Sequence, residues 1–281
     1  MIDDVLAALA CPHCGLGLSR RETAVGCDAG HRFDLARQGY LSLLGARART
    51  DTADTPNMVA ARAEFLGAGH YSTIADALAA AVAATAVRPR LLVEVGAGTG
   101  YYLSASLGAA PEARGIAIDA SVPAARRAAR VPRVGSVVAD AWSRLPVLDG
   151  AADLVLSVFA PRNPVEIARI LAPGGTLLVV TPQPGHLAAL IGPLDMLTVG
   201  DDKDARLNTS LGPYFELVDS RAIRFTKMLN RSDVRLLVEM GPSAHHVDRQ
   251  QFSTALAALP DPCRVTADVT VTSWSPISRQ P

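Results

Sequence analysis

Three of the four cysteines in this chain lie close to one histidine near the N-terminus. Cys11, Cys14, Cys27 and His31 follow the pattern C-x2-C-x12-C-x3-H. Thiolates and an imidazole in two closely spaced pairs are the ligands that a tetrahedral zinc ion accepts. Free buried cysteines or a disulfide are the alternatives, and a reducing cytosol disfavours the disulfide. Because four protein ligands leave no open position, the pattern predicts a structural rather than a catalytic zinc site.

A glycine-rich turn directly follows an apolar run at 91–95. Gly96, Gly98 and Gly100 have the spacing G-x-G-x-G, and Glu94 precedes them. Dinucleotide-binding enzymes use G-x-G-x-x-G instead. The observed spacing is typical of sites for S-adenosylmethionine (SAM), where glycines let the backbone approach the cofactor. A carboxylate before the turn can organise the loop and the methionine ammonium group.

Two aspartates strengthen the prediction of a SAM site. Asp119 ends the next apolar run, and Asp140 ends the one after that. A carboxylate in the first position can accept hydrogen bonds from both ribose hydroxyls, and one in the second can accept from the adenine amino group. Either aspartate could instead cap a helix, which is the commoner role for a single such residue. The three features in register favour the cofactor site.

The elements that must position these residues alternate along the middle of the chain. Strand-like runs occur at 91–95, 115–119, 136–140, 152–159 and 176–181, with helical stretches between them. This alternation predicts βαβ units around a parallel sheet. The remaining elements are two helices within 58–85 broken at 67–70, helices near 186–197, 232–240 and 250–259, and strands near 215–220, 221–229 and 264–274.

Length and composition favour a soluble protein with a large and a small domain. The chain has 281 residues, of which 49% are apolar, and 27 basic residues balance 27 acidic ones. We expect a zinc-binding domain at 1–44, a linker or mobile loop at 45–57, and a catalytic domain at 58–281. No membrane span or basic secretory signal is evident, so a cytoplasmic location without membrane contact is predicted.

Motifs along nearly the whole chain resemble those of RlmA-type 23S rRNA (guanine-N1)-methyltransferases, closest to their tylosin-resistance (TlrB) branch. The resemblance rests on the cysteine pairs, HRFDLARQGYLSLL (31–44), MVAARAEFLGAGHY (58–71), EVGAGTGYYL (94–103), SVFAPRNPVEIARILAPGGTLLVVTP (157–182), GHL (185–187) and MGPS (240–243). It implies a class I SAM-dependent methyltransferase with a Rossmann-like, mostly parallel seven-stranded sheet, after a small zinc-ribbon-like domain. It also implies methylation of guanine N1, recognition of an rRNA hairpin by the zinc domain, and a homodimer.

The resemblance adds cofactor contacts to those expected from the motifs. Tyr71 and His186 would contact SAM beside the turn from Gly96 to Tyr101, which includes Thr99 and Gly100. Without the resemblance, Tyr71 is better explained as an aromatic residue that packs at a helix end. His186 is then best explained as a residue at the start of a helix.

The stretch SVFAPRNP follows the fourth strand, at the edge where class I methyltransferases place their substrate. Phe159 is predicted to stack on the guanine, and Asn163 or the backbone carbonyls of 159–161 to bind its Watson–Crick edge. Arg162 is a candidate phosphate ligand. The alternative is an irregular turn that caps the next helix. No residue is identified as the general base, so the catalytic residue is left open.

Four arginines of the zinc-binding segment suit RNA phosphates. Arg20 and Arg21 lie between the two ligand pairs, and Arg32 and Arg37 follow the last ligand. An ordinary solvated surface explains each of them equally well.

Two other functions remain open from the sequence. One is a SAM-dependent methyltransferase that acts on a small metabolite such as a quinone or carboxylic acid, which leaves the zinc-binding segment unexplained. The other is a binding protein with a degenerate methyltransferase domain, and the intact set of Glu94, three glycines and two aspartates argues against it. Transfer of labelled methyl groups to rRNA, compared with a metabolite extract, separates all three.

Overall fold

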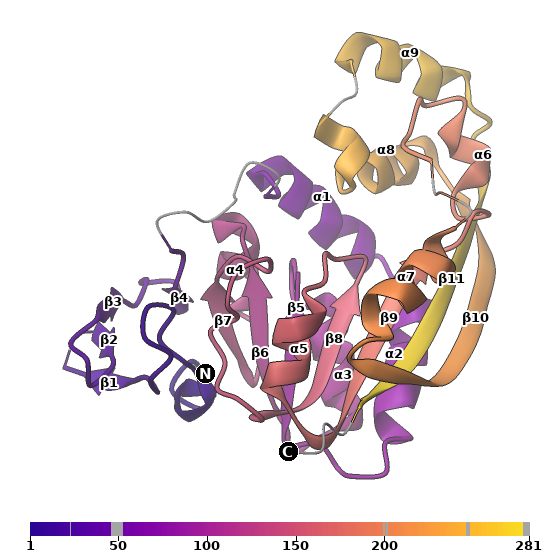
Figure 1. Ribbon diagram of the computed structural model, residues 1–281. Coiled ribbons are helices and arrows are strands. Elements are labelled where there is room, and N and C mark those ends of the chain that lie inside the picture. The colour runs from indigo at the N-terminus through magenta and orange to yellow at the C-terminus, as the bar shows by residue number, and fades with distance from the viewer. Residues whose placement is uncertain (23, 46–52, 199, 201, 246–247, 278–281) are drawn as a thin grey trace.

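The apolar runs of the middle region form one sheet in the computed structural model, which describes residues 1–22, 24–45, 53–198, 200, 202–245 and 248–277 (Figure 1). The strands are β5 (Leu91–Val95), β6 (Arg114–Asp119), β7 (Val134–Val138), β8 (Ala152–Val158) and β9 (Leu171–Pro182). Neighbours among these five pair in parallel. β7 is buried along its whole length, as expected for a strand covered on both faces. The prediction of a parallel sheet is confirmed.

Helices connect the strands and lie on both sides of the sheet (Figure 1). They are α1 (Pro56–Gly67), α2 (Ser72–Ala83), α3 (Tyr101–Ala109), α4 (Val122–Ala128) and α5 (Pro164–Ile170). Thr55 caps α1 by accepting a hydrogen bond from the Met58 amide, so this helix begins at Pro56, two residues before the predicted start. Residues 46–52 of the predicted linker lie outside the described residues. No helix in the described ranges has the length and apolar character needed to cross a bilayer.

The C-terminal part adds an antiparallel hairpin with a helical cap. Its elements are α6 (Ala188–Ile191), α7 (Lys203–Leu211), β10 (Phe215–Leu229), α8 (Arg231–Glu239), η2 (Pro242–His245), α9 (Arg249–Ala258) and β11 (Cys263–Pro276). β10 is one strand rather than the predicted two, because its pairing with β11 continues past an irregularity at 217–219. β11 pairs with β9 only over 269–274, so the far end of the hairpin projects beyond the sheet. The projecting end carries α8 against α1 (Figure 1).

Residues 1–44, here called the N-terminal module, form a small sheet and also extend the large one. The elements are η1 (Leu6–Ala8), β1 (Ser19–Arg21), β2 (Ala24–Gly26), β3 (Arg32–Asp34) and β4 (Tyr40–Ser42). The first three strands form an antiparallel sheet, whereas β4 pairs in parallel with β7. The large sheet therefore has the order β10-β11-β9-β8-β5-β6-β7-β4 in the described residues. Residues 58–281 supply the seven expected strands, and β4 is an eighth that sequence reasoning did not assign.

The N-terminal module and the large sheet share a hydrophobic core. Leu9 forms an isolated bridge with Val147 of the loop between β7 and β8. A Cβ on Gly135 of β7 would lie 2.3 Å from Cγ2 of Val5, so this glycine lets the start of the chain pack directly on the strand. One cluster of buried side chains includes Ile2, Leu41 and Leu43 from the module and Val93, Val137 and Leu145 from the larger part. The burial of these side chains stabilises both parts together.

Candidate active site and metal centre

The glycine turn after β5 touches the loop that follows β8. Gly96, Gly98 and Gly100 have φ angles of +73°, +53° and +76°. This left-handed region costs a residue with a Cβ about 1–2 kcal/mol. A Cβ on Gly96 would also lie 2.4 Å from the Cβ of Ala160. The turn therefore requires glycine at Gly96 both for its backbone conformation and for the close approach of the two loops.

Glu94 supports this turn from within the protein. Its buried carboxyl group accepts a hydrogen bond of 3.0 Å from the Leu103 amide in α3. Burial raises the pKa of Glu94 well above its usual value, the Leu103 amide opposes that rise, and the charge of Asp119 adds to it. The carboxyl group thus ties the end of β5 to α3, in keeping with its predicted role of organising the loop.

Asp119 lies at the carboxyl end of β6 and faces the glycine turn. One carboxylate oxygen accepts from the Gly98 amide at 2.7 Å, and the other accepts from the Ser121 amide at 2.8 Å. Burial raises the pKa of Asp119, these two amides lower it, Asp54 raises it and Arg62 lowers it. The cap of α4 is Ser121, so the capping alternative does not describe Asp119. Each oxygen retains a lone pair for a ribose hydroxyl.

Asp140 begins the loop that joins β7 to β8. Its carboxylate accepts from the Trp142 amide at 2.9 Å and from the Ser143 hydroxyl at 3.1 Å. No helix starts here, so Asp140 holds a turn rather than a helix end. The turn keeps this carboxylate at the same edge of the sheet as Asp119, where the carboxyl ends of parallel strands meet.

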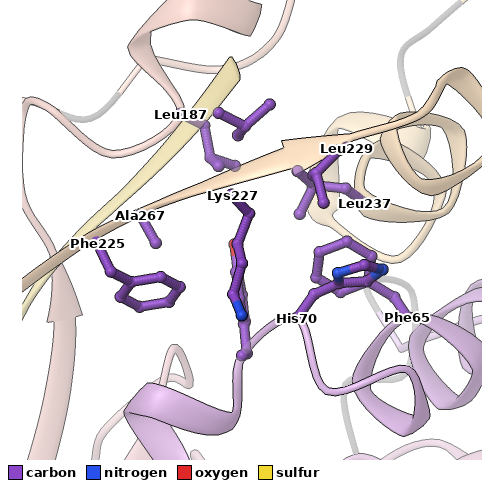
Figure 2. A pocket seen from close by; sticks show the side chains of 10 residues that line it. Phe65, His70, Leu187, Phe225, Lys227, Leu229, Leu237 and Ala267 are labelled. Carbon is purple, nitrogen blue, oxygen red and sulfur yellow. The ribbon is translucent and has the colours of Figure 1, made fainter. Parts of the chain in front are cut away.

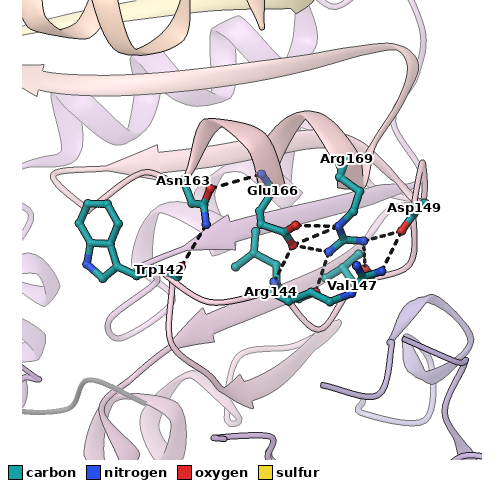
Figure 3. Close-up of polar contacts among 8 residues, drawn as sticks. Trp142, Arg144, Val147, Asp149, Asn163, Glu166 and Arg169 are labelled. Atoms are coloured by element: carbon teal, nitrogen blue, oxygen red, sulfur yellow. Dashed lines mark hydrogen bonds and ion pairs between the residues drawn. The ribbon is translucent and has the colours of Figure 1, made fainter. Parts of the chain in front are cut away.

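An ion-pair network fixes the rest of that loop (Figure 3). Arg169 of α5 donates to the carbonyls of Leu145 and Val147 at 2.8 Å each and to the carboxylates of Glu166 and Asp149 at 2.6 Å each. Arg144 pairs with Asp149 at 3.3 Å. Its Nη2 would lie 3.3 Å from a Cβ on Gly15, beside the first cysteine pair. The loop that begins at Asp140 therefore reaches the N-terminal module.

Aromatic side chains gather where β8 ends. Phe159 has a φ of +53° and is 41% exposed. Its ring centroid lies 6.4 Å from Tyr71, 6.5 Å from Tyr102 and 5.8 Å from His186. A bulky residue in left-handed conformation is strained, and such strain is concentrated at functional sites. The structure therefore brings Tyr71, Phe159 and His186 together, and their contacts with cofactor and substrate stay predictions.

The protonation of Tyr71 and His186 follows from their partners. His186 Nδ1 accepts from the Asp268 amide at 3.2 Å, which places the ring proton on Nε2, 3.4 Å from the Tyr71 hydroxyl. Burial, followed by the charge of Lys203, lowers the pKa of His186 to about 4. Burial also raises the pKa of Tyr71 well above its usual value. Both groups are neutral near pH 7.

Tyr71 also lines a small, mostly apolar pocket, of which Figure 2 labels most of the side chains. The side chains around this point include Phe65, Leu187, Phe225, Leu229 and Leu237, with His70 and Lys227 as the polar ones. The cavity between them measures about 10 Å³, which holds at most one water molecule. These residues therefore pack around Tyr71 and leave no room between them for a second ligand.

Arg162 and Asn163 have local partners in the loop after β8. Arg162 donates to the Ala160 carbonyl at 3.1 Å, and burial lowers its pKa. Asn163 caps α5 by accepting from the Glu166 amide at 3.4 Å, and its amide donates to the Trp142 carbonyl at 3.2 Å. Asn163 thus has the capping role that the sequence left as an alternative, and contact of either side chain with guanine stays a prediction.

The four predicted zinc ligands converge in the N-terminal module. Their ligand atoms all lie within 4.8 Å of one another. Nδ1 of His31 is 3.5 Å from Sγ of Cys11 and 3.3 Å from Sγ of Cys27, and Cys14 lies 3.5 Å from Cys27. Tetrahedral zinc with ordinary bond lengths separates such atoms by about 3.5–3.8 Å. The cluster therefore fits a four-coordinate zinc ion.

Hydrogen bonds in this cluster favour the thiolate that a metal needs. Burial opposes ionisation of Cys27, but hydrogen bonds from the His31 side chain and from nearby amides outweigh it and lower its pKa to about 6. Cys11 and Cys27 are buried and Cys14 is exposed. Cys11 and Cys14 lie in the turn before β1, and Cys27 and His31 lie in the turn between β2 and β3.

The four arginines predicted to bind RNA are all exposed but differ in their partners. Arg20 lies 3.6 Å from Asp3, and Arg21 lies 2.5 Å from Asp28. Arg32 and Arg37 make no ion pair with any described residue. Exposed ion pairs contribute little stability, so a phosphate can replace them at small cost. Arg32 and Arg37 are available without such a replacement.

Sequence reasoning missed two residues that the structure places at the site. Tyr102 packs beside Phe159, whereas the predicted Tyr101 lies at the start of α3, where burial and then the charge of Asp76 raise its pKa. Arg62 of α1 lies against the glycine turn, where a Cβ on Gly98 would be 3.0 Å from its Nη1. A basic residue in the otherwise mostly apolar start of α1 was the available signal for Arg62.

The fold and site define a class of protein, the class I SAM-dependent methyltransferases. A family model described as "Methyltransferase domain" matches residues 93–179, and one described as "RlmA, N-terminal" matches residues 9–50. A complex between the Haloferax volcanii Trm112 methyltransferase activator and a protein assigned as a methyltransferase aligns with a TM-score of 0.53. That alignment has 17% identity and covers 80% of this chain and 98% of the other. At this identity the likeness shows the fold alone.

Full-length relatives give the family. The 23S rRNA (guanine(748)-N(1))-methyltransferase of Streptomyces fradiae is 46% identical, over 99% of this chain and 100% of its own length. A relative from Micromonospora griseorubida is 45% identical over the same shares, and its name assigns it a 23S rRNA guanine-N1 methylation. The chain belongs to the family of 23S rRNA (guanine-N1)-methyltransferases.

Proposed function

We propose that this chain transfers a methyl group from SAM to N1 of a guanine in a 23S rRNA hairpin. The observation that carries the proposal is the position of Phe159, exposed and strained beside Tyr71 and His186, next to the glycine turn of the cofactor site. A flat, partly exposed ring at this edge can stack on a base that has left its RNA stack. Membership of the family over the full chain supports the same conclusion.

The residues divide the work of the reaction between binding and orientation. Bound SAM supplies an electrophilic methyl group. Asp119 would hold the ribose, Asp140 the adenine, and the glycine turn the methionine end. Phe159 would fix the plane of the guanine, and alignment of N1 with the methyl group supplies much of the acceleration. Because His186 and Tyr71 are neutral, the charges of Arg162 and of Lys203, which also lowers the pKa of His186, are the ones that would favour loss of the N1 proton.

The N-terminal module serves as the RNA-recognition domain in this proposal, and residues 58–281 as the methyltransferase domain. The zinc ion stabilises a module with little core of its own and thereby positions Arg20, Arg21, Arg32 and Arg37. RNA recognition by single arginines at this surface rests on charge rather than on base contacts. The reaction belongs in the cytoplasm, where ribosomal RNA is available.

We also infer a homodimer. β10 is an edge strand of the large sheet, and its exposed apolar residues include Val218, which is 67% exposed, and Met228, which is 59% exposed. A long edge strand with exposed apolar side chains is suited to pairing with another chain. Light scattering at micromolar concentration measures the mass, and a single chain of 29.4 kDa would contradict the inference.

Methyl transfer from tritiated SAM tests the function directly. We expect label in a 23S rRNA hairpin and none in an extract of small metabolites. Methylation at N1 blocks Watson–Crick pairing, so primer extension on the product should stop at one guanine. Asp119→Ala serves as the control that loses the cofactor contact. Label in a quinone or carboxylic acid, with none in RNA, would instead establish the small-molecule activity.

Replacing Arg32 and Arg37 together with alanine should weaken hairpin binding and reduce its dependence on salt. Each lost phosphate contact is expected to lower the slope of log affinity against log salt by about one, so the double variant should lose about two. Arg20→Ala with Arg21→Ala should have a smaller effect, because each already pairs with an aspartate. The matched control is Arg88→Ala with Arg90→Ala, exposed before β5. Equal slopes for all variants would contradict RNA recognition by the module.

A further inference from the structure

Arg62 joins three parts of the molecule at the cofactor site. Its Nη1 pairs with Oδ2 of Asp54, and its Nη2 donates to the Met240 carbonyl at 2.7 Å. The same Nη1 lies against Gly98, at 3.0 Å from where a Cβ would be. The charge of Arg62 also lowers the pKa of Asp119. The guanidinium therefore lies between the glycine turn, the segment before α1 and the end of α8.

At this position Arg62 can bind an anion in addition to its ion pair with Asp54. The side chain of Arg62 remains 24% exposed and that of Asp54 17% exposed, so the pair borders an accessible space. Arg62 has five N–H donors, and among the described residues only Asp54 and Met240 accept from it. The remaining donors can bind a second carboxylate in a planar, two-pronged arrangement.

The charges of SAM decide which of its atoms Arg62 can face. The sulfonium and ammonium groups are cationic and the adenosine is neutral, so the methionine carboxylate is the one anionic group. Asp54 and Asp119 surround the site with negative charge, which would repel that carboxylate without a nearby cation. A guanidinium beside the glycine turn attracts the carboxylate and repels the sulfonium, which selects one orientation of the cofactor.

We propose that Arg62 binds the methionine carboxylate of SAM, with Asp54 as the fixed counter-ion that holds the guanidinium over the glycine turn. The assignment rests on the proposed function in that it takes SAM as the cofactor of this site. The Ser121 hydroxyl donates to the Asp54 carbonyl at 2.7 Å and thus keeps Asp54 next to the residues that hold Asp119. The hydrogen bond to Met240 connects the same arginine to the helical cap.

Calorimetric binding of SAM and of decarboxylated SAM tests this assignment without any methyl transfer. Decarboxylated SAM lacks only the group that Arg62 would contact. The intact protein should bind SAM at least tenfold more tightly than decarboxylated SAM. Arg62→Met, which keeps the aliphatic stem over Gly98, should lower SAM affinity by about ten- to a hundredfold and leave decarboxylated SAM within about threefold. The SAM affinity of Arg62→Lys should lie between that of the intact protein and that of Arg62→Met, because lysine keeps the charge but loses the planar fork.

Two controls separate failure of this assignment from failure of the proposed function. Asp119→Ala should weaken the binding of both ligands, because both contain the ribose. Arg126 is an exposed arginine of α4, and Arg126→Ala should change the binding of neither. If the intact protein binds SAM, but Arg62→Met lowers the affinity for both ligands equally or for neither, Arg62 is structural and the assignment is overturned. Equal binding of the two ligands by the intact protein overturns it without a variant. If neither ligand binds the intact protein, the proposed cofactor site itself fails.

Discussion

Cys27→Ser should abolish stoichiometric zinc binding and unfold the N-terminal module. Structural zinc contributes about 10–16 kcal/mol of apparent binding free energy to isolated finger peptides, which is as large as the whole stability of a typical domain. Serine supplies a poor ligand in place of a buried thiolate that lies 3.3 Å from Nδ1 of His31 and 3.5 Å from Sγ of Cys14. The substitution should therefore cost more than about 4 kcal/mol of unfolding free energy.

The effect should extend beyond the module, because its core is not separate. Leu9, Leu41 and Leu43 lie in the same buried cluster as Val137 of β7. Unfolding of the module would expose this face of the sheet and remove the edge strand β4. Metal analysis should find one zinc ion per chain in the intact protein and much less in the variant, and thermal unfolding should shift to lower temperature. A chelator should reproduce both changes in the intact protein.

Cys263→Ser is the matched control, because Cys263 is also buried but lies in β11, outside the cluster. It should retain one zinc ion and lose no more than about 1–3 kcal/mol, the usual range for a single buried substitution. Stoichiometric zinc in Cys27→Ser would refute the ligand assignment. For the same reason, a chain that starts near Thr55 is a poor test of RNA recognition, because it lacks β4 and exposes the core that β4 covers.

Residues whose role depends on local spacing were predictable from the sequence. The zinc ligands come in two close pairs, so a short chain segment fixes each half of the cluster. The glycine turn and Asp119 follow directly from strand ends, and the carboxyl ends of parallel strands meet at one edge. The five apolar runs of the middle region form the expected strands, and β7 and β8 are apolar enough to be buried over almost their whole length.

Other features depend on contacts between distant segments and left no local signal. β4 is only three residues long and pairs with β7 nearly a hundred positions away, so the sequence shows no periodicity that would predict it. The position of Arg62 depends on contacts with Asp54, Gly98 and Met240, which lie in three different segments of the chain. Asn163 caps α5 through the Glu166 amide, which its spacing allowed, but its bond to the Trp142 carbonyl joins two loops that are about twenty residues apart in the sequence.

Gly96→Ala should nearly eliminate SAM binding and methyl transfer while leaving the zinc site intact. The new Cβ would lie 2.4 Å from the Cβ of Ala160, whereas carbon atoms in contact keep about 3.5–4.0 Å. The turn cannot rotate away freely, because the Gly96 amide donates to the Ile118 carbonyl at 2.9 Å. The loops that carry the cofactor and Phe159 must therefore separate by about 1 Å. A displacement of that size costs about a hundredfold in rate, in addition to about 1–2 kcal/mol of backbone strain.

Gly108→Ala is the matched control, because Gly108 lies in α3 with no atom within 4 Å of a new Cβ. That substitution should leave binding and transfer unchanged and raise stability by up to about 1 kcal/mol, since alanine is the better helix former. Adding Ala160→Gly to Gly96→Ala removes the opposing Cβ and should restore part of the activity. The part that stays lost then measures the strain at a φ of +73°, whereas no recovery would mean that strain alone is responsible. Binding and transfer by Gly96→Ala within threefold of the intact protein would show that the two loops do not need this close approach. The methyl donor and Phe159 would then be positioned by other contacts.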